Sequence, residues 1–133
     1  MKLILSQSLA ALSLTLAASA HAQLVVIVNP AAEALTQNQV ADIFLGRNKS
    51  FTPLNQAEAA PIRVEFYEKA TGRDLSQVKA TWARLVFTGK AAMPKELADS
   101  AAVKKAVAAD PKAIGYVEKS AVESGVKVVL TLE

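Results

Sequence analysis

Residues 24–46 read LVVIVNPAAEALTQNQVADIFLG, and this stretch contains the pattern that decides the fold. Its first five residues are apolar, and the last four of these are β-branched, which favours a buried strand. Asn29-Pro30 ends the strand and begins a loop. Thr36 then begins a helix as its N-cap, and Gln39 completes a capping box. A strand followed by a helix is the repeating unit of an α/β fold.

The next segments are expected to form a loop and a second strand. The helix that starts at Thr36 ends at Gly46, a natural stop residue. Residues 47–60 are polar and include Pro53, which is typical of a loop. Residues 62–66 alternate as IRVEF, which is the period-2 pattern of a half-buried strand.

Two further helices follow. Asp74 caps the first of them, with Gln77 three residues later as the second half of a capping box. Its apolar face is expected to consist of Leu75, Val78, Trp82, Leu85 and Val86. The next helix is expected over residues 99–109, and Pro111 prevents its continuation. Its predicted inward residues are Val103, Ala106 and Val107.

The chain ends with two short apolar segments that are expected to be strands, residues 114–117 and 126–130. Between them, residues 120–123 have the composition of a capping box on a very short helix, which Gly125 closes. Strands therefore alternate with helices along the chain. The expected fold class is α/β, with a small mixed sheet flanked by helices.

The N-terminus has the features of a secretory signal peptide. Lys2 precedes an apolar run over residues 3–18, and Ala20-His21-Ala22 provides a small-x-small cleavage site. The run is shorter than the roughly 20 apolar residues that a spanning helix requires. We therefore expect residues 1–22 to be a signal peptide cleaved after Ala22, and residues 23–133 to form one periplasmic domain without a membrane span.

Composition narrows the classes of function. Removing Lys2 lowers the formal net charge from +3 to +2, which is too small to indicate nucleic-acid binding. The chain has no cysteine, and its one histidine, His21, lies in the expected signal peptide. The mature chain would therefore have no thiol nucleophile, no imidazole base and none of the usual transition-metal ligands. We expect a protein that is not an enzyme and needs no metal or cofactor.

Three segments then point to a family: residues 35–46 (LTQNQVADIFLG), 82–90 (WARLVFTGK) and 113–117 (AIGYV). In this order they resemble the phosphate-type periplasmic solute-binding proteins of ABC importers. More closely, they are similar to the short, single-lobe members of that family, and the resemblance runs from about Val25 to Leu130.

The resemblance implies a single lobe of a type II periplasmic-binding-protein-like fold. It also implies a periplasmic solute-binding protein related to phosphate or oxyanion uptake, with a small oxyanion as ligand and an ABC permease as partner. The alternative is an envelope interaction or signalling module that kept the lobe without its ligand, so that its partner is another envelope protein. The residues alone leave both open.

The best candidate site is Thr71-Gly72-Arg73-Asp74, expected between a strand and the start of a helix. Free backbone N–H groups and the helix dipole favour an anion at such a position, and arginine can grip an oxyanion with two parallel hydrogen bonds. The same composition also suits an ordinary turn with Asp74 as a cap. Phosphate-binding relatives place Ser-Gly-Thr at this helix start and an arginine four residues earlier, where this chain has Tyr67, while Arg63 lies four residues further upstream.

A first prediction concerns export. Because the charged start, the apolar run and the Ala20-His21-Ala22 site occur together, the mature protein should begin at Gln23. Mass spectrometry of the protein recovered from the periplasm measures this directly. Recovery of the full-length chain in the cytosol would contradict it.

Overall fold

The structure is a computed structural model that describes residues 23–133. The predicted signal peptide, residues 1–22, lies outside the described residues. Within residues 23–133 the elements are, in chain order, β1 (Leu24–Val28), α1 (Gln37–Phe44), β2 (Thr52–Gln56), α2 (Pro61–Thr71), α3 (Leu75–Phe87), β3 (Lys95–Leu97), α4 (Ser100–Ala109), β4 (Ala113–Glu118), the 3-10 turn η1 (Lys119–Ala121) and β5 (Lys127–Leu132). None of the described helices is long and apolar enough to cross a membrane.

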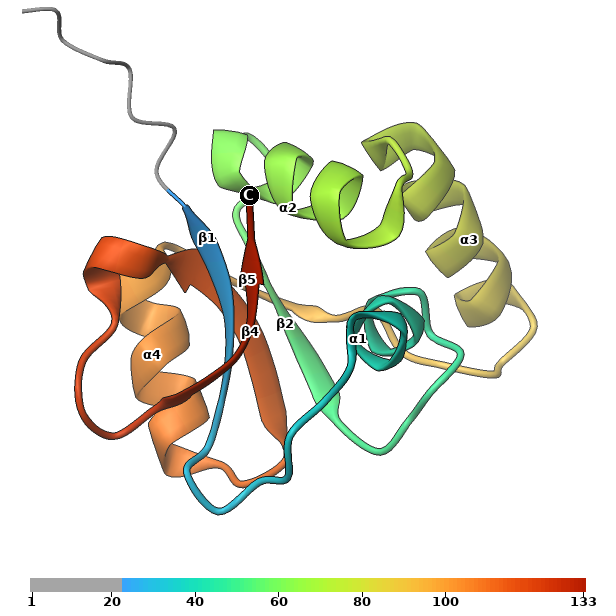
Figure 1. The fold of residues 1–133 in the computed structure, drawn as a ribbon. Helices are drawn as coiled ribbons and strands as arrows, with labels where there is room; N and C mark the ends of the chain where they lie inside the picture. The colour runs from blue at the N-terminus through green and yellow to red at the C-terminus, as the bar shows by residue number, and fades with distance from the viewer. Residues whose placement is uncertain (1–22) are drawn as a thin grey trace, which may run out of the picture.

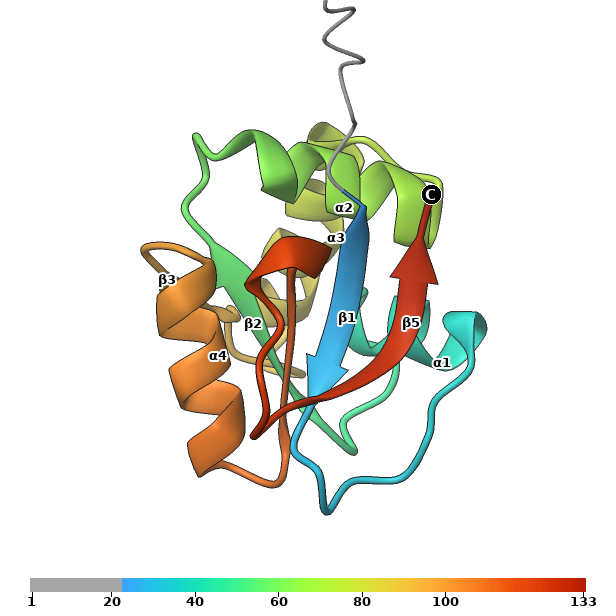
Figure 2. The same ribbon diagram turned by 60° about the vertical axis from the view of Figure 1, so that its left-hand side comes forward.

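The strands form one mixed sheet in the order β3-β2-β4-β1-β5. Strand β1 is antiparallel to both of its neighbours, β4 and β5, whereas β2 is parallel to β4 and to β3. Figure 2 shows β5 beside β1 at one edge and β3 toward the other edge. The predicted fold class, α/β with a small mixed sheet flanked by helices, is confirmed.

Helices cover both faces of the sheet. Figure 1 shows α4 on one side, and α1, α2 and α3 on the other. Each side has its own hydrophobic core, and β1 contributes to both because its side chains alternate. Leu24, Val26 and Val28 belong to the larger core beneath α1, α2 and α3. Val25 and Ile27 belong to the smaller core beneath α4.

The starts of α1 and α3 confirm the capping boxes that were predicted at Thr36 and Asp74. Thr36 Oγ1 accepts a hydrogen bond from Gln39 N, and the Gln39 side chain accepts one from Thr36 N, so this capping box is complete. Asp74 and Gln77 form the same reciprocal pair at the start of α3. Asp99 caps α4 through Ala102 N. Each cap satisfies N–H groups that the helix itself leaves without a partner.

The prediction of a strand at residues 62–66 is wrong, since these residues lie in helix α2. Ile62 and Phe66 are both buried and are four residues apart, which suits one helix face as well as an alternating strand. The pattern becomes helical when Tyr67 and Ala70 are included, because both are also buried. Pro61 at the helix start was a further signal.

The prediction of a loop throughout residues 47–60 is also wrong, because β2 lies within it and pairs with β4 and β3. Pro53 is tolerated near the start of this strand. The last residues of β2, Asn55 and Gln56, are polar but buried, so no apolar pattern marks the strand. The three-residue strand β3, between α3 and α4, was also not expected.

Smaller differences occur toward the end of α3 and of the chain. Val86 is 42% exposed and does not belong to the buried face, because only Val78 and Trp82 of α3 are buried. The expected capped helix at 120–123 is instead the turn η1, which has no side-chain cap. The predicted strands at 114–117 and 126–130 are present as β4 and β5, and the second begins and ends later than expected.

Trp82 anchors α3 on the rest of the larger core. It is 4% exposed, and its indole Nε1 donates a hydrogen bond to the Phe44 carbonyl oxygen over 2.9 Å. Phe44 is the last residue of α1, so the indole joins the end of one helix to the middle of another. Its hydrogen bond removes the cost of burying the indole N–H without a partner.

Replacing Trp82 with alanine should therefore lower the free energy of unfolding by about 3–5 kcal/mol, the usual loss for a large core aromatic residue. Urea denaturation of the protein comprising residues 23–133 measures the change. The matched control is Val86→Ala on the same helix, which should change stability by less than about 0.5 kcal/mol because that side chain is partly solvated. A loss below about 1 kcal/mol for Trp82→Ala would show that the indole is not a core anchor.

Candidate functional site

The four predicted site residues form the connection between two helices, not between a strand and a helix. Thr71 is the last residue of α2, and Gly72 follows as its C-cap with a left-handed φ of 70°. Arg73 completes the turn, and Asp74 is the N-cap of α3. The four residues are contiguous and contact neighbouring backbone mainly through the Thr71 hydroxyl, which donates to Tyr67 O and accepts from Arg73 N.

The start of α3 already holds one carboxylate. Asp74 Oδ1 accepts a hydrogen bond from Gln77 N over 2.9 Å, and Asp74 N donates to Gln77 Oε1 over 3.2 Å. A carboxylate at this position complements the positive end of the helix dipole, which would otherwise favour a bound anion. A fully ionised oxyanion would therefore meet negative charge at Asp74, while a protonated one could donate a hydrogen bond to it.

Arg73 provides the positive charge of this turn. Its side chain is partly exposed, and the ion pairs within residues 23–133 do not include it. The guanidinium thus keeps its donors for solvent or for a ligand, and its planar geometry matches two oxygens of an oxyanion. Arg73 and the backbone of the turn are the groups through which these residues could hold an anion.

Arg63 does not contribute to this turn. It lies in the first turn of α2, eight residues before Thr71, which corresponds to about 12 Å along a helix axis. Its side chain is buried, and its Nη1 donates to Gln56 O and to Glu96 Oε1. Its Nε is buried and has no hydrogen-bond partner within the described residues. Arg63 is therefore committed to the carboxyl end of β2.

Buried polar groups join β2 to the larger core. Asn55 Oδ1 accepts hydrogen bonds from the hydroxyls of Tyr67, over 2.9 Å, and Tyr116, over 3.1 Å. The Tyr116 hydroxyl in turn accepts one from Gln56 N over 3.0 Å. No local sequence pattern indicates this cluster, because the polar composition of residues 47–60 is typical of a loop. We name Asn55, Gln56, Tyr67 and Tyr116 the β2 polar cluster.

Burial changes the acid–base chemistry of the two tyrosines. Burial raises the pKa of Tyr67 to about 12, although the hydrogen bond with Asn55 and the charge of Arg63 act in the opposite direction. Burial also raises the pKa of Tyr116, against the effect of its hydrogen bond with the Gln56 backbone. Both hydroxyls thus stay protonated at neutral pH and act as hydrogen-bond donors. Their role is structural, since both side chains are fully buried.

A hollow of about 350 Å³ lies beside this cluster, where α2 and α4 begin. Three acidic residues line it, Glu65, Asp99 and Glu118, and no lysine or arginine does. Negative charge on every titratable side chain of its wall disfavours an anion there. Within residues 23–133, no three acidic residues are close enough together to hold a metal ion.

Known structures share this fold. A phosphate ABC transporter substrate-binding protein from Clostridium perfringens, solved with bound phosphate, matches with a TM-score of 0.62 and 20% identity, covering 81% of this chain and 45% of its own. An ABC-type phosphate transport receptor from Vibrio cholerae matches with a TM-score of 0.61 and 18% identity, and the match covers 81% of this chain and 46% of the receptor. PstS from Borrelia burgdorferi matches with a TM-score of 0.55 and 13% identity, and the match covers 81% of this chain and 47% of PstS.

These likenesses show that the chain has the fold of one periplasmic-binding-protein-like lobe. The chain spans about half the length of the solved proteins that it matches. No family model and no curated protein sequence matches it. At 20% identity or less, the likeness extends to the fold alone.

The raised tyrosine pKa predicts how stability depends on pH. The pKa of Tyr67 is about 12 in the folded protein against an ordinary value of 10.0, so the folded state favours the protonated hydroxyl. This contribution is fully present below pH 10 and is lost as pH rises toward 12. The free energy of unfolding should therefore fall over this range, by about 2–3 kcal/mol from Tyr67 alone.

Chemical denaturation of the protein comprising residues 23–133 across this pH range measures the effect. Tyr67→Phe is the control, because it removes the titrating group while keeping the ring. The variant loses a hydrogen bond at every pH, so the slopes of stability against pH are compared rather than the absolute values. Equal slopes for the two proteins would show that Tyr67 does not titrate abnormally.

Proposed function

We propose that this chain is a periplasmic solute-binding protein that is not an enzyme and that binds a small oxyanion such as phosphate. In this proposal it serves an ABC importer. The fold of the described residues supports the proposal, since the solved proteins that share it are named as phosphate transport receptors or substrate-binding proteins. A fold can serve several functions, so the proposed ligand rests on the site itself.

The observation that carries the proposal is the arrangement at Thr71-Gly72-Arg73-Asp74. Arg73 supplies a guanidinium that forms no ion pair within residues 23–133, next to the start of a 13-residue helix. The charge of Arg73 favours an oxyanion, whereas Asp74, which already complements the dipole of α3, favours one that still carries a proton. Monohydrogen and dihydrogen phosphate satisfy that condition, and sulfate does not.

The geometry predicts weak binding. Gly72 and Asp74 are exposed, so water hydrates an anion at this turn on its outer side. Each charge-assisted hydrogen bond then competes with solvent. We expect a dissociation constant near or above about 0.1 mM, because a few such contacts must offset the translational freedom that the ligand loses.

Isothermal titration calorimetry of the mature protein with phosphate and sulfate tests the proposal. Phosphate should bind and sulfate should bind more weakly, and Arg73→Ala should abolish phosphate binding. Arg47→Ala is the matched control, because Arg47 is an exposed arginine in another loop. Its Nη1 lies 3.6 Å from Asp42 Oδ1. If about 10 mM phosphate changes neither the heat signal nor the melting temperature, the oxyanion proposal fails.

One observation favours the alternative of an envelope interaction module. Phe87, the last residue of α3, is 92% exposed, and Met93 shortly after it is 55% exposed. An exposed aromatic side chain at a helix end provides an anchor that a partner protein could bury. A failure of oxyanion binding would make this interaction role the better supported function.

A further inference from the structure

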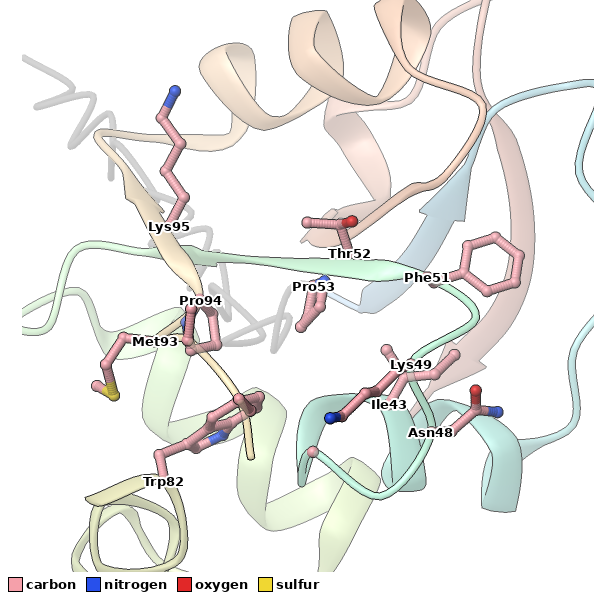
Figure 3. Close-up of a pocket in the computed structure, with 13 residues that line it drawn as sticks. Ile43, Asn48, Lys49, Phe51, Thr52, Pro53, Trp82, Met93, Pro94 and Lys95 are labelled. Atoms are coloured by element: carbon pink, nitrogen blue, oxygen red, sulfur yellow. The ribbon is translucent and has the colours of Figure 1, made fainter. Parts of the chain in front are cut away.

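A second hollow of about 370 Å³ is lined by none of the residues of the turn at Arg73. It is formed between the loop that follows α1, the start of β2, the middle of α3 and the segment that precedes β3 (Figure 3). Its volume lies within the range of about 300–1,000 Å³ that is typical of small-molecule sites. We name it the Trp82 pocket.

The wall of the Trp82 pocket is largely apolar. Ile43, Pro53, Trp82 and Pro94 contribute to it from four different segments. The indole N–H of Trp82 already donates to Phe44 O, so Trp82 contributes apolar ring atoms to the pocket wall and no free hydrogen-bond donor. Met93 also lines it, although this side chain is 55% exposed. An apolar group that filled the pocket would remove part of this surface from water.

The titratable side chains of the pocket are positive. Lys49 and Lys95 line it, and no lining residue is acidic. Figure 3 shows the Lys49 ammonium directed inward from its loop, whereas the Lys95 ammonium points away. Lys49 donates one hydrogen bond to the Lys90 carbonyl oxygen, and the ion pairs within residues 23–133 do not include it. An ammonium has three donors, so the others stay available.

This combination is the opposite of the hollow beside the β2 polar cluster, where acidic residues alone are charged. A single inward cation against an apolar wall complements a monoanion that has an apolar body. Inorganic phosphate would gain the contact with Lys49 but would place its other oxygens against hydrocarbon, which costs desolvation free energy. A neutral apolar molecule would leave the ammonium without a counter-charge.

We propose that the Trp82 pocket binds small amphipathic monocarboxylic acids, with the apolar body against Trp82 and Pro94 and the carboxylate on Lys49. The site is separate from the oxyanion turn and shares no residue with it. Its ligand class differs as well, so either proposal can fail without the other. A pocket of this size accommodates an aromatic ring that carries a short acid chain.

Trp82 makes the test direct, because it is the only tryptophan of the chain. Its fluorescence reports on ligands in this pocket without a label. We expect 4-phenylbutyrate to change the emission in a saturable way. The uncharged 4-phenylbutanol should bind about tenfold more weakly or worse, and inorganic phosphate should leave the emission unchanged. No saturable change up to about 10 mM 4-phenylbutyrate would overturn the proposal, as would equal binding of the alcohol.

Two variants test separately the charge of Lys49 and the free space of the Trp82 pocket. Lys49→Gln should weaken 4-phenylbutyrate binding about tenfold, whereas Lys105→Gln, on the opposite face of the sheet in α4, should not change it. Ala92→Phe places a large side chain at an exposed position of the pocket wall and should block binding, and it leaves Trp82 as the single fluorescent tryptophan. If Lys49→Gln does not fold, as judged by circular dichroism, Ala92→Phe decides instead. Unchanged binding in Lys49→Gln or in Ala92→Phe would overturn the proposal.

Discussion

Strand β1 is the element on which the rest of the structure depends, because it separates the two hydrophobic cores and contributes to both. All five of its residues are buried, and it pairs along its length with β4 on one side and with β5 on the other. Burying one valine, leucine or isoleucine side chain contributes about 1.5–3 kcal/mol. A polar residue at any of the five positions would face a core without water, so the segment tolerates only apolar side chains.

The β2 polar cluster provides hydrogen-bond partners for polar residues that are buried in the same sheet. Strand β2 ends in Asn55 and Gln56, which would destabilise the core if their amide groups had no partners. The hydroxyls of Tyr67 and Tyr116 donate to the Asn55 amide oxygen, from a helix and from the neighbouring strand. The Gln56 side-chain amide donates to the Tyr116 carbonyl oxygen and to the Ser100 hydroxyl. The rings of the two tyrosines also pack with Phe44 and Phe66, and Phe66 stacks on Tyr116 at 4.1 Å between ring centres. Polar satisfaction and aromatic packing thus hold β2 and α2 in place together.

Charge is distributed unevenly among the concave parts of the surface. The hollow where α2 and α4 begin has three acidic residues, whereas the Trp82 pocket has two lysines and no acidic residue. The turn at Arg73 has one charge of each sign. An anion therefore finds favourable charge at Arg73 and in the Trp82 pocket, and it is disfavoured at the acidic hollow.

The sequence alone predicted much of this fold because short-range physics decides those parts. Strand β1 follows from a run of β-branched residues, and α1, α3 and α4 follow from caps and apolar spacing. The four candidate site residues were proposed from a turn pattern, and they do form a turn, although the element before them was expected to be a strand. What lies at that turn is a junction of two helices, in which Asp74 already occupies the helix start.

Only the tertiary structure decided the remaining parts. The apolar spacing of residues 62–66 fits a helix and a strand equally well. The helical form of α2 follows from the burial of Tyr67 and Ala70, which lie after this segment on the same helix face. Strand β2 has no apolar pattern. The two tyrosines that donate hydrogen bonds to its residue Asn55 are 12 and 61 residues away in the chain. The Trp82 pocket likewise combines four distant segments, which no local pattern can bring together. Local sequence determined where helices begin and where the central strand lies, whereas long-range hydrogen bonds and packing decided which polar residues are buried and where the surface is hollow.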